Sequence, residues 1–422
     1  MNCILSIPID VRLVAIFLLG TCLGSLANLG IYRLAWRPRP ISPWSRPDPA
    51  APPRRGFDRL PVLGWLGLRR EAVLHGPGFW IRPMLLELLC GMGLAALYYW
   101  EISGGLLPAG VRGPFQPEVL NVLHLEFAAH SVLITFMLIG SMIDADEMII
   151  PDEITVSGAL IGLLVAAVWP RSLLPDIGAG PAPQAAMILG FLHVTSPGAW
   201  PAVLGGAPQT PSLWIALGCW CLWCLAILPR TWYTRHGLRR AVQLSLARVL
   251  RQRSSVRILR MAIVGGLVIA VVWYGGGLPW QGLLSALVGM AAGGGLIWLV
   301  RIIGSAALGR EAMGFGDVTL MAMIGSFLGW QSSLLIFFLA PIAGLVVGLF
   351  RAILWRNREI PYGPFLCLAA LLLIICWDGF WQWSQPIFEL GWLVPAAMGA
   401  CLLLMGGMLA VWRLILAAIH TG

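Results

Sequence analysis

The sequence predicts an all-α polytopic membrane protein, and composition supplies the first two observations. Hydrophobic residues make up 59% of the chain and charged residues only 11%, whereas soluble domains carry about 25% charged residues. The mean hydropathy is +0.83. The third observation is a series of apolar runs that approach the roughly 20 residues needed to cross a bilayer. We therefore expect the lipid bilayer to be a partner of this chain.

About eleven apolar runs are expected to form transmembrane helices. In chain order they cover residues 13–34, 84–99, 122–143, 154–168, 213–228, 261–274, 283–303, 318–330, 333–354, 364–377 and 393–415. The first run continues into an arginine-rich segment, so we interpret it as a span rather than a cleaved signal. The nine cysteines are scattered and indicate no disulfide framework.

The arginines test this topology, because cytoplasmic loops are enriched in basic residues. All 28 basic residues are arginines. With the N-terminus outside and the spans alternating, 25 of the 28 fall on the inner side, and only Arg12, Arg112 and Arg171 fall outside. The net charge of +9 is thus explained by membrane topology, and we expect no nucleic-acid partner.

Two acidic clusters reach the same inner membrane edge in this topology. One is Gly314-Phe315-Gly316-Asp317, and the other holds Asp144, Asp146 and Asp152. Ionised carboxylates are costly at a bilayer and tend to be functional there, and two that converge suggest the shared-proton pair of an aspartic protease. Glycines beside the aspartate let backbone and substrate approach closely. The residues alone do not choose among Asp144, Asp146 and Asp152.

Several segments, taken in order, resemble the prepilin peptidases, the type IV leader peptidase family of intramembrane aspartic proteases. They are Leu23-Gly24-Ser25-Leu26-Ala27-Asn28, Asp58-Arg59-Leu60-Pro61, Ile81-Arg82-Pro83, Ile143-Asp144-Ala145-Asp146, Ile150-Pro151-Asp152-Glu153, Met313-Gly314-Phe315-Gly316-Asp317 and Ile360-Pro361-Tyr362-Gly363-Pro364.

The resemblance implies a GxGD-type protease in the bacterial cytoplasmic (inner) membrane with its active site facing the cytoplasm. Such an enzyme cleaves the basic leader of type IV prepilins or of type II secretion pseudopilins after a glycine. By position, Asp144 and Asp317 match the two catalytic aspartates, and Asp152 matches a supporting acid. One carboxyl of such a pair keeps its proton and hydrogen-bonds the scissile carbonyl, while the other activates a water.

The departures from the family pattern concern the first inner loop and the spacing of the aspartates. Members that also N-methylate their product often carry two Cys-x-x-Cys pairs in that loop, whereas this loop has no cysteine. Four-thiolate zinc is excluded there, methyl transfer is doubtful, and no cofactor or metal is expected. Thr319 stands where the family commonly has lysine. Leu60, Val62, Leu63, Trp65 and Leu66 are expected to anchor the loop.

The long separation of Asp144 and Asp317, 172 residues, indicates an inserted helical hairpin, and the last span also looks additional. The expected organisation is a first span (1–34), an Arg/Pro-rich cytoplasmic loop (35–83), a core with the first aspartate (84–170), an insertion-containing region (171–303) with a basic loop (230–260), a core with the GFGD block (304–390) and a C-terminal span (391–422).

Two other functions stay open. A transporter or channel uses intramembrane acids to bind cations, but places them near the bilayer midplane between repeated halves, and neither feature is evident. A catalytically inactive pilus or secretion assembly factor needs no aspartate pair. His124, Glu126 and His130 are interpreted as paired interior residues or as residues of the outer interface, rather than as a proton relay. Gly293-Gly294-Gly295 is interpreted as a site of close helix packing.

Overall fold

The computed structural model describes residues 6–108, 115–176, 190–228, 253–309, 311, 313–354 and 361–421. These residues form a bundle of helices with one two-stranded antiparallel sheet, in which β1 (Pro175–Asp176) pairs with β2 (Gly190–Phe191). The predicted all-α polytopic class is confirmed.

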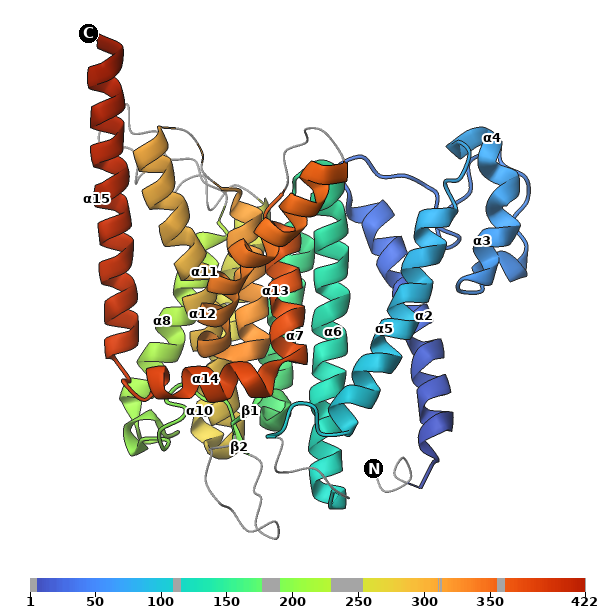
Figure 1. The fold of residues 1–422 in the computed structure, drawn as a ribbon. Coiled ribbons are helices and arrows are strands. Elements are labelled where there is room, and N and C mark those ends of the chain that lie inside the picture. Colours follow the sequence, from blue (N-terminus) through green and yellow to red (C-terminus); the bar gives the residue numbers. More distant parts are fainter. Residues whose placement is uncertain are drawn as a thin grey trace.

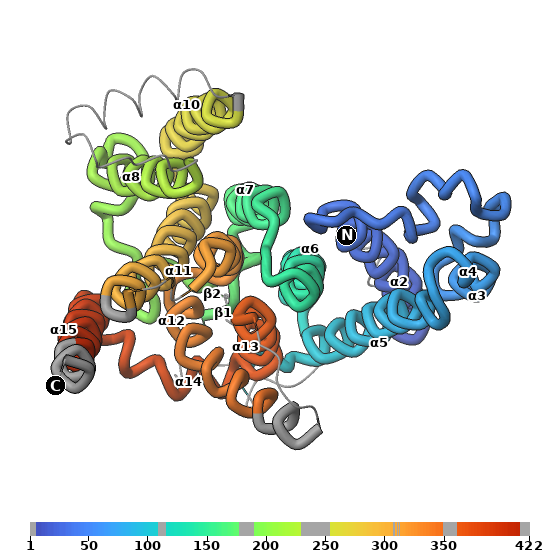
Figure 2. The backbone as a smooth tube through the Cα atoms, turned by 90° about the horizontal axis from the view of Figure 1, so that it is seen from above, coloured from blue at the N-terminus to red at the C-terminus, as the bar shows by residue number. Residues whose placement is uncertain are grey.

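The long helices are α2 (Ile9–Leu34), α5 (Ile81–Ile102), α6 (Pro117–Glu147), α7 (Asp152–Val168), α8 (Thr210–Ala226), α10 (Arg253–Gly275), α11 (Gly277–Leu308), α12 (Phe315–Leu354), α13 (Gly363–Ile375), α14 (Trp377–Phe388) and α15 (Leu393–Thr421). Short helices are η1 (Gly56–Arg59), α3 (Leu63–Leu68), η2 (Arg69–Glu71), α4 (Ala72–His75), η4 (Pro170–Ser172) and η5 (Ala202–Leu204). Seen from above, α6 and α7 lie between the α2–α5 pair and the cluster of α11, α12 and α13 (Figures 1 and 2).

Among the described residues, seven helices are long and apolar enough to cross a membrane, or eight if α13 and α14, bent by 94° at their junction, form one span. The helices α7 and α8, at 17 residues each, are shorter than this criterion requires. All eleven predicted ranges overlap helices, but the count of eleven spans stays a prediction.

The element α12 contains a turn at Gly329, whose backbone is not helical (φ 83°, ψ 174°). A Cβ atom on Gly293 of α11 would lie 2.8 Å from the Met321 carbonyl oxygen and 2.9 Å from Ser333 Oγ. Twelve residues along one straight helix would separate those atoms by about 18 Å. The chain therefore turns back at Gly329, between the predicted runs 318–330 and 333–354.

The glycines of α11 permit this hairpin to pack closely. In addition to the contacts of Gly293, a Cβ atom on Gly294 would lie 2.9 Å from Ala322 Cβ. Side chains at these positions would push the helices apart, because membrane helices gain their association energy from close van der Waals contact. The predicted packing role is confirmed for Gly293 and Gly294, whereas a Cβ atom on Gly295 would meet nothing within 4 Å.

The helices α8 and α10 pack on each other and on α11. Trp220 lies over Gly265, and its indole N–H donates to the Ala262 carbonyl oxygen at 2.9 Å. This pair corresponds to the predicted inserted hairpin, although its being an insertion stays a prediction. Most of the predicted basic loop 230–260 lies outside the described residues, and residues 253–260 begin α10.

Residues 35–80 form a small helical unit, the loop unit, beside the ends of α2 and α5. Trp65 and Leu68 lie one helical turn apart on α3 and are buried with Ile41. Leu60 and Leu63 are about half exposed, and so is Leu66. The prediction that all these apolar residues anchor the loop is therefore wrong, because a helix of one or two turns buries only one face.

Buried polar contacts do most of the anchoring. Glu71 is fully buried and forms an ion pair with Arg54 at 2.9 Å. The side chain of Asp58, 1% exposed, is bound by Arg70. Glu87 of α5 accepts hydrogen bonds from the Val62 backbone N–H at 2.5 Å and the Trp65 indole at 2.9 Å. These contacts lie in a loop that contains no cysteine.

The ion pair of Asp58 predicts that the loop unit loses stability in acid. Burial acts to raise the pKa of Asp58, but hydrogen bonds and charge from Arg70 outweigh it and lower the pKa. The ionised carboxylate therefore stabilises the unit above the unfolded-state pKa of roughly 3.9, and this stabilisation is lost as pH falls through the lower folded-state pKa.

Asp58→Asn should raise hydrogen exchange and protease cleavage in residues 35–80 at neutral pH, and should weaken the acid-induced loss of protection seen in the wild type. Asp10→Asn, at an exposed position in the first turn of α2, is the matched control and should change neither. If residues 35–80 of Asp58→Asn were protected as well as in the wild type at both neutral and acidic pH, the stabilising role of the Asp58 carboxylate would be contradicted.

Candidate active site

Asp144 lies in the last turn of α6 and is 5% exposed. The helix ends at Met148, whose left-handed conformation (φ 56°) brings its N–H to the Asp144 carbonyl oxygen at 2.8 Å. The carboxyl group accepts a hydrogen bond from the backbone N–H of Gly363, the first residue of α13. Its Oδ2 atom is buried beside Gly363 and has no hydrogen-bond partner among the described residues.

Asp317 lies in the first turn of α12 and is 7% exposed. The adjacent glycine is required by packing, because a Cβ atom on Gly316 would lie 2.9 Å from Ile150 Cβ. The hydroxyl of Thr319 donates to the Gly316 carbonyl oxygen at 3.0 Å. Thr319 is 3% exposed, so the residue that replaces the family's usual lysine is directed to its own helix rather than to the site.

The two carboxyl groups meet around Ile150 and Gly363. Ile150 packs on Gly316, and a Cβ atom on Gly363 would lie 2.9 Å from Ile150 Cδ1 and 2.5 Å from Asp144 Oδ2. The carboxyl groups are close enough for the charge of Asp144 to act on Asp317. Like charges at such a site do not both ionise cheaply, so the pair titrates as a unit and can share one proton.

The structure does not bring the other candidate carboxylates into this pair. Asp146 forms an ion pair with Arg82 at 2.8 Å, with both side chains about two-fifths exposed. Asp152 is exposed at the start of α7. Neighbouring Glu147 accepts a hydrogen bond from the Trp36 backbone N–H at 2.6 Å. Asp146 and Glu147 thus attach the loop unit and α5 to α6, at the end of the bundle that holds the site.

Sequence reasoning did not assign roles to Gly363 and Ile150, which form the wall between the aspartates. The segment Pro361-Tyr362-Gly363-Pro364 contributes only to the family resemblance. Its glycine is needed because the backbone itself donates to Asp144 and no side chain fits there. A glycine before a helix-starting proline is compatible with many loops, so the pattern alone does not reveal this contact.

The histidines of α6 lie far from the aspartates. His130 Nδ1 is 2.8 Å from Glu101 Oε1, with both side chains buried, and His124 Nε2 is 3.0 Å from the Tyr98 hydroxyl. Fourteen residues from His130 to Asp144 correspond to about 21 Å of helix. The predicted pairing is confirmed for the two histidines, whereas Glu126 is 1% exposed and its Oε2 atom has no hydrogen-bond partner among the described residues. Among the described residues, no group of three or more His, Cys, Asp or Glu side chains could hold a metal ion.

A buried carboxyl pair on two helices of a polytopic membrane protein is the arrangement of an intramembrane aspartic protease. Residues 253–349, which include Asp317, match the model of the type IV leader peptidase family. These residues are similar to the family that the sequence resembles, and the matched domain indicates a protease. Asp144 lies outside the matched residues, so its place in the site rests on the structure.

Similar proteins share part of the chain. Three are named prepilin leader peptidase/N-methyltransferase. The protein from Aeromonas salmonicida is 32% identical over 123 residues, 28% of this chain and 40% of the relative. The Aeromonas hydrophila protein is 30% identical over 139 residues, which are 31% of this chain and 47% of the relative. The Pseudomonas aeruginosa protein is 33% identical over 120 residues, which are 26% of this chain and 41% of the relative. The chain thus spans less than half of each. No solved structure matches it significantly.

Gly363→Ala should lower activity by about a hundredfold while the protein still accumulates, because a methyl group displaces the Asp144 carboxyl from its position. Peptide cleavage per mole of folded protein is the measurement. Gly379→Ala in α14, where a Cβ atom meets nothing within 4 Å, is the control and should remain fully active. Wild-type activity of Gly363→Ala would show that the contact is not needed.

Proposed function

We propose that this protein is an intramembrane aspartic endopeptidase that removes the basic leader of type IV prepilins or type II secretion pseudopilins at the cytoplasmic membrane face. The observation that carries the proposal is the convergence of Asp144 and Asp317, two buried carboxyl groups from separate parts of the chain. The leader peptidase domain and the names of the similar proteins support the substrate class.

The reaction follows from the geometry of the pair. A water bound between the carboxyl groups loses a proton to the ionised one and attacks the scissile carbonyl. The protonated carboxyl donates a hydrogen bond to the developing oxyanion, and the proton then passes to the leaving amine. The Gly363 N–H binds the Asp144 carboxyl group and so helps to fix its orientation. Two aspartates are sufficient for this chemistry without a metal ligand.

The orientation is supported by the loop unit. Arg82 and the backbone of Trp36 contact Asp146 and Glu147, one turn beyond Asp144. The arginine-rich loop unit therefore lies at the same end of the bundle as the site, and Figure 1 shows its helices α3 and α4 at that end. Basic loops remain on the cytoplasmic side, so we place the catalytic pair at the cytoplasmic face of the bacterial inner membrane.

Asp144→Asn and Asp317→Asn should each abolish leader removal, because an amide keeps the shape of the carboxyl group but neither takes nor gives the catalytic proton. A loss of at least about a thousandfold is expected for each, and the double variant should be no worse. Co-expression with a prepilin and immunoblotting of the processed form measures it. Asp146→Asn is the control and should retain cleavage.

Processing by either single variant would show that the wrong residues have been assigned. Pilus or secretion assembly that persists in both variants while leader removal is absent in the wild type would favour an assembly factor. Selective cation uptake by the wild type, lost in the variants, would favour a transporter.

A separate proposal about zinc and methyl transfer is based on the loop unit. Ion pairs hold residues 35–80 where cysteine pairs would bind zinc in related chains, so purified protein should contain no stoichiometric zinc and a chelator should leave cleavage unchanged. Methylation of the new N-terminus should be weak or absent, as measured by mass spectrometry of the processed pilin. A fully methylated product made by this enzyme alone would refute the methylation proposal and leave the peptidase proposal standing.

A further inference from the structure

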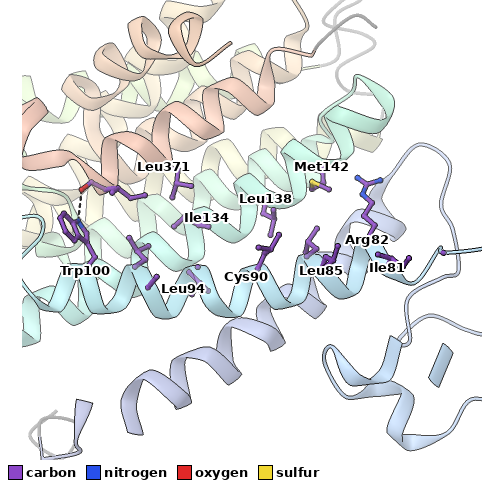
Figure 3. Close-up of a pocket in the computed structure, with 17 residues that line it drawn as sticks. Ile81, Arg82, Leu85, Cys90, Leu94, Trp100, Ile134, Leu138, Met142 and Leu371 are labelled. Carbon is purple, nitrogen blue, oxygen red and sulfur yellow. Dashed lines mark hydrogen bonds between the residues drawn. The ribbon is translucent and has the colours of Figure 1, made fainter. Parts of the chain in front are cut away.

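A long apolar groove of about 930 Å³ separates α5 from α6 and α13 (Figure 3). Its floor on α5 is one stripe of the helix at spacings of three and four residues, formed by Arg82, Leu85, Leu89, Gly93, Ala96 and Trp100. All six positions are exposed. The opposite wall includes Ile134, Leu138 and Met142 of α6 and Leu371 of α13. The α5 side of the groove is therefore an apolar helix face that no described element covers.

The length of the groove corresponds to a complete membrane crossing. From Arg82 to Trp100 the helix rises about 27 Å, close to the roughly 30 Å of a bilayer's hydrocarbon core. A lipid acyl chain belongs to one leaflet and covers about half of that distance. A transmembrane helix of about 20 residues matches the whole groove.

The surface of the groove also suits a helix better than a lipid. In the middle of the groove, the small residues Gly93 and Ala96 leave the backbone of α5 accessible, and a Cβ atom on Gly93 would meet nothing within 4 Å. Small residues allow the backbone of a second helix to approach closely. The polar groups at the two ends are already occupied, since Arg82 is paired with Asp146 and the Trp100 indole donates to the Ile375 carbonyl oxygen at 2.9 Å. Neither end offers a free cation for a lipid phosphate.

The groove ends beside the aspartate pair. Met142 lines its inner end and precedes Asp144 by two residues on α6. Residues two apart on a helix face nearly opposite sides, so the carboxyl group lies on the side of α6 away from the groove. A peptide reaches it by passing around the end of α6, and half the circumference of a helix about 10 Å across is about 16 Å. About five extended residues span that path. A peptide whose helix lies in the groove can thus reach the pair with a short extended segment.

We propose that this groove binds the apolar transmembrane helix of the peptide substrate and presents a scissile bond about five residues beyond the helix end to Asp144 and Asp317. The inference rests on the proposed peptidase function and adds the substrate subsite, with Gly93 at its centre. Binding energy from the helix, remote from the reacting bond, then contributes to cleavage.

The first test fills the groove. Gly93→Trp should lower kcat/KM at least about tenfold for a peptide with a basic leader, a cleavage-site glycine and a 20-residue apolar helix. It should leave cleavage of the same peptide truncated before the helix unchanged. Gly218→Trp on α8 is the matched control, because that glycine is also exposed on a helix with nothing within 4 Å, and it should behave as wild type.

Equal rates for the Gly93 and Gly218 variants on the helix peptide would overturn the proposal. Equal losses on both peptides would do so too, because the tryptophan would then be disturbing the aspartates rather than the helix. Wild-type enzyme that cleaves neither peptide would instead refute the proposed function, and the next measurement still decides the groove.

The second test identifies the occupant without requiring cleavage. A photo-crosslinking benzoylphenylalanine is placed at Leu89 in the groove, which is 63% exposed, or at Leu225 on α8, which is 64% exposed. The protein carries Asp144→Asn and is reconstituted in phosphatidylethanolamine and phosphatidylglycerol vesicles with the helix peptide. A peptide adduct at Leu89 but not at Leu225 supports the proposal. Lipid adducts alone at Leu89 would show that the groove is a lipid site and would overturn it.

Discussion

The hydrogen bond from the Gly363 backbone to Asp144 is the contact on which the site depends. A buried carboxylate without partners is costly at a membrane edge, so Asp144 can remain there only if the protein supplies donors. The donor is the start of α13, which is brought to α6 by packing around Ile150. The same packing seats the first turn of α12, and with it Asp317. One close approach of three segments therefore determines the electrostatics of the pair.

Close approach also explains the glycines elsewhere in the bundle. The α11–α12 contact depends on glycines that would clash if they carried a Cβ atom, and the turn at Gly329 lets α12 fold back on itself. In a bilayer, apolar side chains gain little by leaving lipid, so helix association depends on tight van der Waals contact. The carboxyl pair that we propose to be catalytic needs such packing, because small displacements of reacting groups are costly in rate.

The loop unit is held together by ion pairs rather than by cysteine ligands. Where thiolates and zinc can organise a short loop, this chain uses Glu71 with Arg54 and Asp58 with Arg70, all largely buried. Removing one partner of a buried ion pair costs about 3–5 kcal/mol because the other charge is left unpaired. Glu87 joins this unit to α5 through Trp65 and Val62. The wall of the groove and the loop unit are consequently parts of one connected structure.

The sequence by itself determined the class of the protein, because hydrophobicity over about 20 residues and the cost of charge in lipid act locally along the chain. It also indicated Asp144 and Asp317, although the choice of Asp144 over Asp146 and Asp152 required a family resemblance. Only the tertiary structure decided that Asp146 pairs with Arg82, that Gly363 donates to Asp144, and that Leu60, Leu63 and Leu66 are not buried. Each of these depends on which segments far apart in the chain become neighbours, and helical periodicity carries no information about that.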